Sequence, residues 1–345
     1  MKKIFLLTLT LGFILFLTGC GDSGSDQVVN VYNWGEYIDA DLLDSFEEET
    51  GIKVNYSTFE TNEQLYTLLA AGGSSYDVII PSDYMAAKLI EEDMLEEINF
   101  DNVPNIELID ERFLGLEYDP DDAYTVPYMW GTVGLIYNTT VVTQEVTSWG
   151  ILFDETYAGQ ILMFDNPRDA FGIALKYLGY SLNTTNEDEI NEAYELLEEQ
   201  SSILQGYVMD QIFDKMESGE AAIAPYYAGD YLSMLENNPD LAFVIPEEGS
   251  NWFVDVMCIP KGSENKENAE AFINYMCSTP AALANTEEIG YTSPNKEVAE
   301  QLDLDDFAYN IMFPSDEVLA NCEVYLHLPE NILTLYDELW VQLKA

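Results

Sequence analysis

Aromatic and carboxylate side chains follow one predicted strand after another in this chain. Apolar runs typical of strands lie at 28–32, 76–80, 161–164 and 221–225, and a further run lies at 254–260. Ligands of parallel α/β sheets collect beyond the carboxyl ends of the strands, so we expect the flanking residues to line one site. These flanking segments are Trp34-Gly35-Glu36-Tyr37, Ser82-Asp83-Tyr84, Asp165-Asn166-Pro167-Arg168-Asp169, Tyr226-Tyr227-Ala228-Gly229-Asp230, Trp252-Phe253-Val254-Asp255 and Gly290-Tyr291.

This mixture suits a cationic ligand, and above all ammonium groups joined by methylenes. An aromatic ring walls a methylene chain and attracts a cation by about 0.5–2 kcal/mol. A buried carboxylate needs a compensating charge, which an ammonium supplies. An anionic ligand would need Arg, Lys or helix N-termini, and Arg168 is the only basic residue in these loops. Because the chain has 64 acidic residues, carboxylates in these loops are expected by chance. The interpretation therefore rests on the coincidence of carboxylates with aromatic rings in successive loops.

The chain is strongly acidic, with a formal net charge of −52. Such a surface repels nucleic acid and anionic lipid, and it attracts cations. Adaptation to a salty or alkaline habitat explains most of this charge. We therefore expect no nucleic-acid partner, and we do not take the charge as proof of a cationic ligand.

The N-terminus predicts export and a lipid anchor. Lys2 and Lys3 precede an apolar run at 4–17, which is the length of a signal-peptide core and too short to span a bilayer comfortably. The sequence Leu17-Thr18-Gly19-Cys20 resembles the lipobox of bacterial lipoproteins, which implies cleavage before Cys20 and its acylation. We predict a signal peptide at 1–19 and a lipidated, flexible tether at 20–27. An ordinary signal peptide with an incidental cysteine is the alternative. The predicted location is the extracytoplasmic face of the cell membrane, in the periplasm if there is an outer membrane.

The remaining chain alternates between strand and helix patterns, which predicts an α/β fold with parallel sheets. The pattern begins at 28–32, where Asp39 offers an N-cap to the next helix, and it restarts at 125–137. Two such lobes leave a cleft between them.

Five motifs resemble the spermidine/putrescine-binding proteins of polyamine ABC transporters, over nearly the whole mature chain. They are Val31-Tyr32-Asn33-Trp34-Gly35-Glu36-Tyr37, Tyr76-Asp77-Val78-Ile79-Ile80-Pro81-Ser82, Asn166-Pro167-Arg168-Asp169-Ala170-Phe171-Gly172-Ile173-Ala174-Leu175, Ala224-Pro225-Tyr226-Tyr227-Ala228-Gly229-Asp230 and Ile289-Gly290-Tyr291-Thr292-Ser293-Pro294-Asn295. The resemblance implies a two-lobed periplasmic-binding-protein fold of type II, each lobe a mostly parallel sheet flanked by helices. Lobe 1 would span 28–129 plus about 253–300, and lobe 2 would span 130–252 plus about 301–345. A monomer without cofactor or metal, a polyamine ligand and an ABC permease as partner are implied.

The resemblance also implies roles for single residues. Trp34, Tyr37, Tyr227 and Tyr291 match ring positions, Ser82 and Tyr84 match cleft positions, and Glu36 lies between two rings. Asp169 and Asp255 match carboxylates that receive an amine. Asn166 stands where relatives can carry Asp, and Tyr227 stands where they can carry Trp. Phe253 holds the register of a family Trp, with Trp252 shifted by one; since a strand alternates faces, only one can face the ligand, and we favour Phe253. The family's polar contact near the C-terminus falls close to His327, and Asp210 is a further candidate acid.

Several alternatives stay open. We expect Asp83 and Asp230 to be helix caps or solvated charges. Tyr226 and Tyr227 also fit a ferric-ion-binding relative of this fold, and paired carboxylates fit a secreted hydrolase. His327 is the single histidine, and no nucleophile or metal-binding motif is evident, so we expect no enzyme. One pair of Cys258, Cys277 and Cys322 could form a disulfide, although free thiols are favoured. The preferred polyamine is left undecided.

Overall fold

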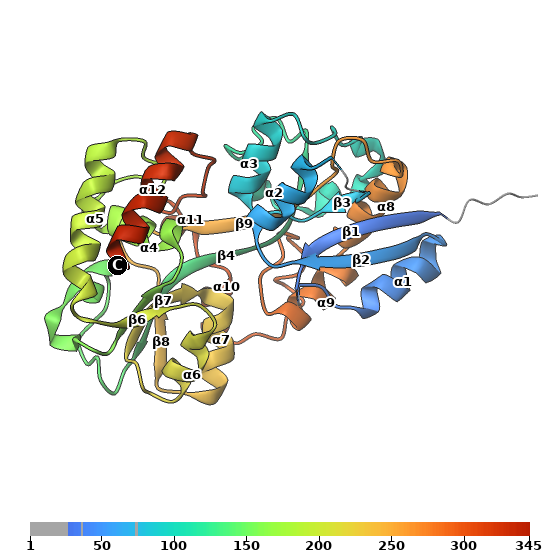
Figure 1. The fold of residues 1–345 in the computed structure, drawn as a ribbon. Coiled ribbons are helices and arrows are strands. Elements are labelled where there is room, and N and C mark those ends of the chain that lie inside the picture. The colour runs from blue at the N-terminus through green and yellow to red at the C-terminus, as the bar shows by residue number, and fades with distance from the viewer. Residues whose placement is uncertain (1–26, 36, 73–74) are drawn as a thin grey trace, which may run out of the picture.

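The computed structural model describes residues 27–35, 37–72 and 75–345, and Figure 1 shows their arrangement. The strands are β1 (Val28–Trp34), β2 (Lys53–Phe59), β3 (Val78–Ile79), β4 (Thr125–Asn138), β5 (Ile161–Phe164), β6 (Leu204–Val208), β7 (Ile223–Tyr227), β8 (Leu241–Val244) and β9 (Trp252–Cys258). The helices are α1 (Asp41–Thr50), α2 (Asn62–Ala70), α3 (Asp83–Glu91), α4 (Pro167–Leu178), α5 (Glu187–Ser201), α6 (Gln211–Glu217), α7 (Ala228–Asn237), α8 (Lys266–Met276), α9 (Thr279–Ile289), α10 (Asp306–Met312), α11 (Asp316–Leu319) and α12 (Glu330–Leu343). Short 3-10 helices lie at Phe100–Asn102, Pro104–Leu108, Glu111–Phe113, Trp149–Phe153 and Glu155–Tyr157.

The strands form a mixed sheet in the order β2-β1-β3-β9-β4-β7-β5-β6, and β8 pairs with β4. Strands β1, β2 and β3 are parallel to each other, as are β5, β6 and β7. Strand β9 is antiparallel to β3 and β4, and β4 is antiparallel to β7. The α/β class is therefore confirmed.

Two hydrophobic cores lie on either side of the middle of β4. The first core draws on residues 29–130 and 254–281, with Val324, and the second core draws on 133–241 and 328–336. Strands β4 and β9 run between the two halves in Figure 1. The predicted lobe boundaries stay a prediction.

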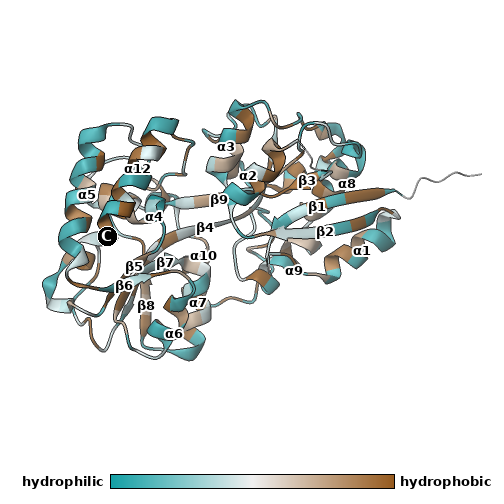
Figure 2. Ribbon diagram, in the orientation of Figure 1, coloured by the Kyte–Doolittle hydropathy of each residue, from teal (hydrophilic) through white to brown (hydrophobic). Residues whose placement is uncertain are grey.

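Local chemistry explains where several elements begin and end. Helix α1 ends at Gly51, whose φ of 74° is a left-handed conformation that glycine adopts without strain. The expected N-cap at Asp39 is wrong by one residue: Ala40 holds that position, and Asp39 instead accepts a hydrogen bond from the backbone N–H of Asp41 at 3.0 Å. Helix α5 is hydrophilic over most of its visible length in Figure 2, in agreement with its exposed acidic face. Tyr226 and Tyr227 belong to β7 itself and not to the loop after it.

Candidate functional site

Asp255 forms one end of the candidate site. It lies on β9, where only 6% of the residue is exposed. The Tyr37 hydroxyl donates a hydrogen bond of 2.6 Å to its Oδ2. Ser82, which precedes α3, pairs with Asp255 through an isolated backbone bridge. Burial raises the pKa of Asp255 to about 6, although hydrogen bonds from Tyr37 and Ser82 lower it. The ionised carboxylate is therefore costly here without a positive partner.

Asp83 is a second buried carboxylate close to Asp255, and the expectation that it is a cap or a solvated charge is wrong. Ser82 holds the N-cap position of α3, and Asp83 is only 1% exposed. Its Oδ2 accepts from the backbone N–H of Val254 on β9 at 3.4 Å, and its Oδ1 accepts from the N–H of Tyr84 at 2.7 Å. Burial raises the pKa of Asp83 well above its usual range, and the charge of Asp255 raises it further.

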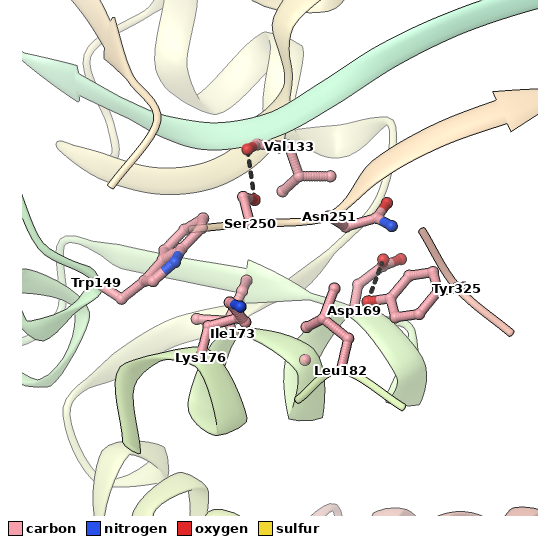
Figure 3. Close-up of a pocket in the computed structure, with 10 residues that line it drawn as sticks. Val133, Trp149, Asp169, Ile173, Lys176, Leu182, Ser250, Asn251 and Tyr325 are labelled. Atoms are coloured by element: carbon pink, nitrogen blue, oxygen red, sulfur yellow. Dashed lines mark hydrogen bonds between the residues drawn. The ribbon is translucent and has the colours of Figure 1, made fainter. Parts of the chain in front are cut away.

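Asp169 forms the opposite end of the site, in the first turn of α4. Asn166 caps this helix, because its Oδ1 accepts from the backbone N–H groups of Arg168 at 2.9 Å and Asp169 at 3.5 Å. The Tyr325 hydroxyl lies 3.3 Å from Oδ1 of Asp169, as Figure 3 shows, and 3.0 Å from the backbone carbonyl oxygen of Arg168. Burial raises the pKa of Asp169 to about 6, against the effects of the Tyr325 hydrogen bond and the Arg168 charge.

A small cavity lies behind Asp169, between α4 and the segments around Ser250 and Tyr325 (Figure 3). Its volume of about 10 Å³ has room for roughly one water molecule. Lys176 also lines it, and its Nζ lies 2.8 Å from Oε1 of Glu323. This lysine is therefore already neutralised by a partner other than Asp169.

Aromatic rings connect the two ends. The Phe253 ring lies 5.5 Å from the Tyr227 ring and 5.7 Å from the Tyr291 ring, measured between centroids. Tyr291 in turn meets Tyr37 edge to face at 5.9 Å. Tyr227 packs against the second core, and Tyr291 packs against the first. The rings thus form one wall built from both halves of the molecule.

Asp230 is a fourth carboxylate at this wall, in the first turn of α7. The Tyr291 hydroxyl donates to its Oδ2 at 3.1 Å. Burial raises the pKa of Asp230 to about 6, and the charge of Asp210 adds to the rise. Within the described ranges, none of Asp83, Asp169, Asp230 and Asp255 forms a salt bridge with a Lys or Arg side chain. The charge of Arg168 lowers the pKa of Asp83 and Asp169 without forming a salt bridge, so the protein compensates the carboxylates of this site only in part.

The comparisons with known proteins agree with this architecture. The family model of bacterial extracellular solute-binding proteins matches residues 41–313. The chain belongs to this family. A spermidine/putrescine-binding periplasmic protein of Escherichia coli (strain K12) is 31% identical and covers 100% of this chain and 99% of its own length. A protein of the same description from Haemophilus influenzae is 32% identical, with 95% of each chain covered.

Solved structures give the same result. The substrate-binding protein of a spermidine/putrescine ABC transporter from Streptococcus pneumoniae, in complex with calcium and HEPES, superimposes with a TM-score of 0.84 at 37% identity, covering 92% of this chain and 98% of that chain. A lipoprotein of Treponema pallidum superimposes with a TM-score of 0.83 at 26% identity, covering 92% and 99%. The predicted resemblance and the two-lobed periplasmic-binding-protein fold are confirmed, and the family is one of solute-binding, non-catalytic proteins.

The structure brings most of the predicted residues together. Tyr37, Ser82, Asp169, Tyr227, Phe253, Asp255 and Tyr291 take part in the contacts described above. Phe253 lies among these rings, whereas Trp252 lies on the opposite face of β9 and contacts Phe113 at 5.8 Å and Trp130 at 6.2 Å. That these residues bind the ligand stays a prediction.

Other predicted residues lie at the margin. The rings of Trp34 and Phe59 pack with their centroids 4.5 Å apart, and the Nε1–H of Trp34 is buried without a partner among the described residues. The Tyr84 hydroxyl accepts a hydrogen bond from Asn62 Nδ2 at 2.8 Å. Glu36 and Cys20 lie outside the described residues.

Sequence reasoning missed three residues of the site: Asp83, Asp230 and Tyr325. Tyr325, and not His327, contacts Asp169. A tyrosine two residues before the expected position was the available signal.

In the described part of the chain, no helix is long and apolar enough to cross a membrane.

Proposed function

We propose that this chain captures a linear polyamine such as putrescine or spermidine between its two cores and delivers it to an ABC permease. The observation that carries the proposal is a set of four carboxylates that form no salt bridge within the described residues: Asp83, Asp169 and Asp255 are buried, and Asp230 is half-buried with a raised pKa. A ligand with several ammonium groups compensates such charges at separate points. Relatives about 30% identical over their full length carry the description spermidine/putrescine-binding.

The order of groups along the site also favours an amine chain. From Asp255, contacts lead through Tyr37 and Tyr291 to Phe253. From Phe253 they lead through Tyr227 to Asp169, whose pKa a hydrogen bond from Tyr227 lowers. Carboxylates accept from ammonium groups, while ring faces cover the methylenes and attract the adjacent charges. The rings come from both cores, so the closing of the two halves on the ligand completes the wall.

A ferric ion is a weaker candidate. The rings of Tyr226 and Tyr227 lie 5.0 Å apart. Burial raises the pKa of both phenols, which favours the neutral form over the phenolate that iron prefers. Four carboxylates and a wall of rings also exceed what one ion needs.

Calorimetric titration of residues 21–345 tests the proposal. Putrescine and spermidine should bind with a thermal shift, n-butylamine should bind much more weakly because it has one ammonium, and 1,4-butanediol should not bind because it has none. No heat and no thermal shift with either polyamine would refute the proposed function. A charge-transfer colour with ferric ion would favour the alternative.

We also infer that Cys20 carries a lipid that holds the protein at the extracytoplasmic face of the membrane, where a short tether keeps it near its permease. The Leu17-Thr18-Gly19-Cys20 motif supports this, and a relative of the same fold from Treponema pallidum is described as a lipoprotein. Wild-type protein should incorporate labelled palmitate and sediment with membranes, and Cys20→Ser should do neither. A Cys20→Ser protein that still sediments with membranes would contradict the inference.

A further inference from the structure

Phe253 occupies the seam between the two halves of the molecule. It belongs to neither hydrophobic core, and its ring contacts Tyr227, which packs on the second core, and Tyr291, which packs on the first. On β9 it shares a face with Asp255, two residues further on. The position of this one ring therefore affects the ring wall on both sides and the surroundings of Asp255.

The ring lies directly on Gly131 of β4. Gly131 and Phe253 are partners in the antiparallel register of β4 and β9. A Cβ built on Gly131 would lie 2.7 Å from Cζ of the Phe253 ring and 3.0 Å from Cε1, closer than carbon atoms approach without displacement. The ring thus fills the space that a side chain at position 131 would need.

The backbone does not explain this glycine. Gly131 is absent from the positions of positive φ, so other residues can adopt its conformation. Glycine inside a strand weakens the strand and often marks a close approach of another group. The close approach here is that of the Phe253 ring.

We propose that Gly131 is a positioning residue: it lets the Phe253 ring lie on β4 and thereby sets how this ring meets Tyr227 and Tyr291 in the wall of the ligand site. This inference rests on the proposed function. An alanine at this position displaces the ring from β4 and so changes its contacts with Tyr227 and Tyr291, because the Cβ of Phe253 is fixed by β9. The ring wall then changes shape where the methylenes of the ligand would lie.

Four variants test whether Gly131 positions the Phe253 ring: Gly131→Ala, Phe253→Leu, the double variant, and Gly206→Ala. Gly206 lies in β6, also without positive φ, and a Cβ there would meet nothing within 4 Å, so it controls for the loss of a strand glycine. Leucine at position 253 ends before the ring atoms Cζ and Cε1, which removes the clash.

Calorimetry with putrescine and spermidine should show a loss of affinity of about tenfold or more for Gly131→Ala and no change for Gly206→Ala. The double variant should bind as Phe253→Leu does, since the shortened side chain leaves the alanine harmless. Wild-type affinity in Gly131→Ala, or losses that simply add in the double variant, would overturn the proposal.

Failure of the proposed function gives a different result. If the wild type binds neither amine, thermal unfolding of the same unliganded proteins tests whether the Phe253 ring lies on Gly131, because the clash does not depend on ligand. Gly131→Ala should then lower Tm in the wild-type background and not in the Phe253→Leu background. An equal drop in Tm in both backgrounds would overturn the proposed role of Gly131.

Discussion

Replacing Asp255 by asparagine should stabilise the unliganded protein and weaken its binding of polyamine. Burial raises the pKa of this carboxyl from an ordinary 3.8 to about 6. At about 1.4 kcal/mol per pKa unit, this rise disfavours the ionised form in the folded protein by about 3 kcal/mol. Asparagine has the same shape, and its Oδ1 still accepts the hydrogen bond from the Tyr37 hydroxyl. The substitution thus removes the charge and keeps the contact.

The effect depends on pH in a defined direction. The folded state binds the proton of Asp255 more tightly than the unfolded state, because the folded pKa is the higher one. The penalty is absent below the unfolded value of 3.8, grows as the pH rises towards 6, and is fully present above that. At pH 7.5 the free energy of unfolding of Asp255→Asn should exceed that of the wild type by up to about 3 kcal/mol. Below pH 3.8 the difference should vanish.

Binding should respond in the opposite sense. Loss of the buried carboxylate that pairs with an ammonium should cost about 2–5 kcal/mol of binding free energy. Calorimetry at pH 7.5 measures this loss. Chemical denaturation over the pH range measures the stability. Wild-type affinity in Asp255→Asn would refute the assignment of this residue to the site. An unfolding free energy below that of wild type at pH 7.5 would refute the reasoning from burial.

Asp119 is the matched control, since it is only 3% exposed and lies outside the site. Its carboxylate accepts from the backbone N–H groups of Ala123 at 3.1 Å, Tyr124 at 2.9 Å and Thr125 at 3.0 Å. Asparagine has one acceptor oxygen in place of two, so donors remain unsatisfied. Asp119→Asn should lower the free energy of unfolding by about 1–3 kcal/mol and leave the affinity unchanged.

Two further predictions concern protons at the site. Affinity for polyamine should fall as the pH drops below about 6, because the ammonium groups favour ionised Asp169, Asp230 and Asp255, whose pKa values lie near that pH. Calorimetry at pH 6 in buffers of different ionisation enthalpy should detect proton release, and no release would contradict this account. Tyr325→Phe removes a hydrogen bond that lowers the pKa of Asp169, so it should weaken binding more at pH 6.5 than at pH 8. An equal loss at both values would assign Tyr325 a packing role only.

The sequence was most informative where one local pattern decides the outcome. The predicted restart of the strand and helix pattern at 125–137 coincides with β4, which spans Thr125–Asn138. The alternation of faces along a strand separated Phe253 from Trp252, because only one of two neighbours can share the face of Asp255. The structure puts Phe253 on that face. Both results follow from rules that involve a few neighbouring residues.

Sequence reasoning failed where contacts join distant parts of the chain. Asp83 looks like a helix-capping residue, yet Val254, 171 residues away, donates to its carboxylate and β9 buries it. Asp230 stands in a first turn in the same way, and the Tyr291 hydroxyl reaches it from the other half of the molecule. Capping statistics describe the local helix alone, so they cannot distinguish a solvated acid from one that a distant strand covers.

The buried carboxylates also separate the selectivity of the site from the overall charge of the protein. A net charge of −52 attracts every cation, and its field is screened within about 8 Å at physiological salt. It therefore accelerates encounter without distinguishing a polyamine from a metal ion. Asp169 and Asp255 are 7% and 6% exposed, so salt screens them little, and a ring wall lies between them. The proposed ligand, a cation with charges at both ends and an apolar middle, would satisfy all three groups. The proposed preference for a polyamine consequently depends on these residues, and we expect it to be the same if the surface were neutral.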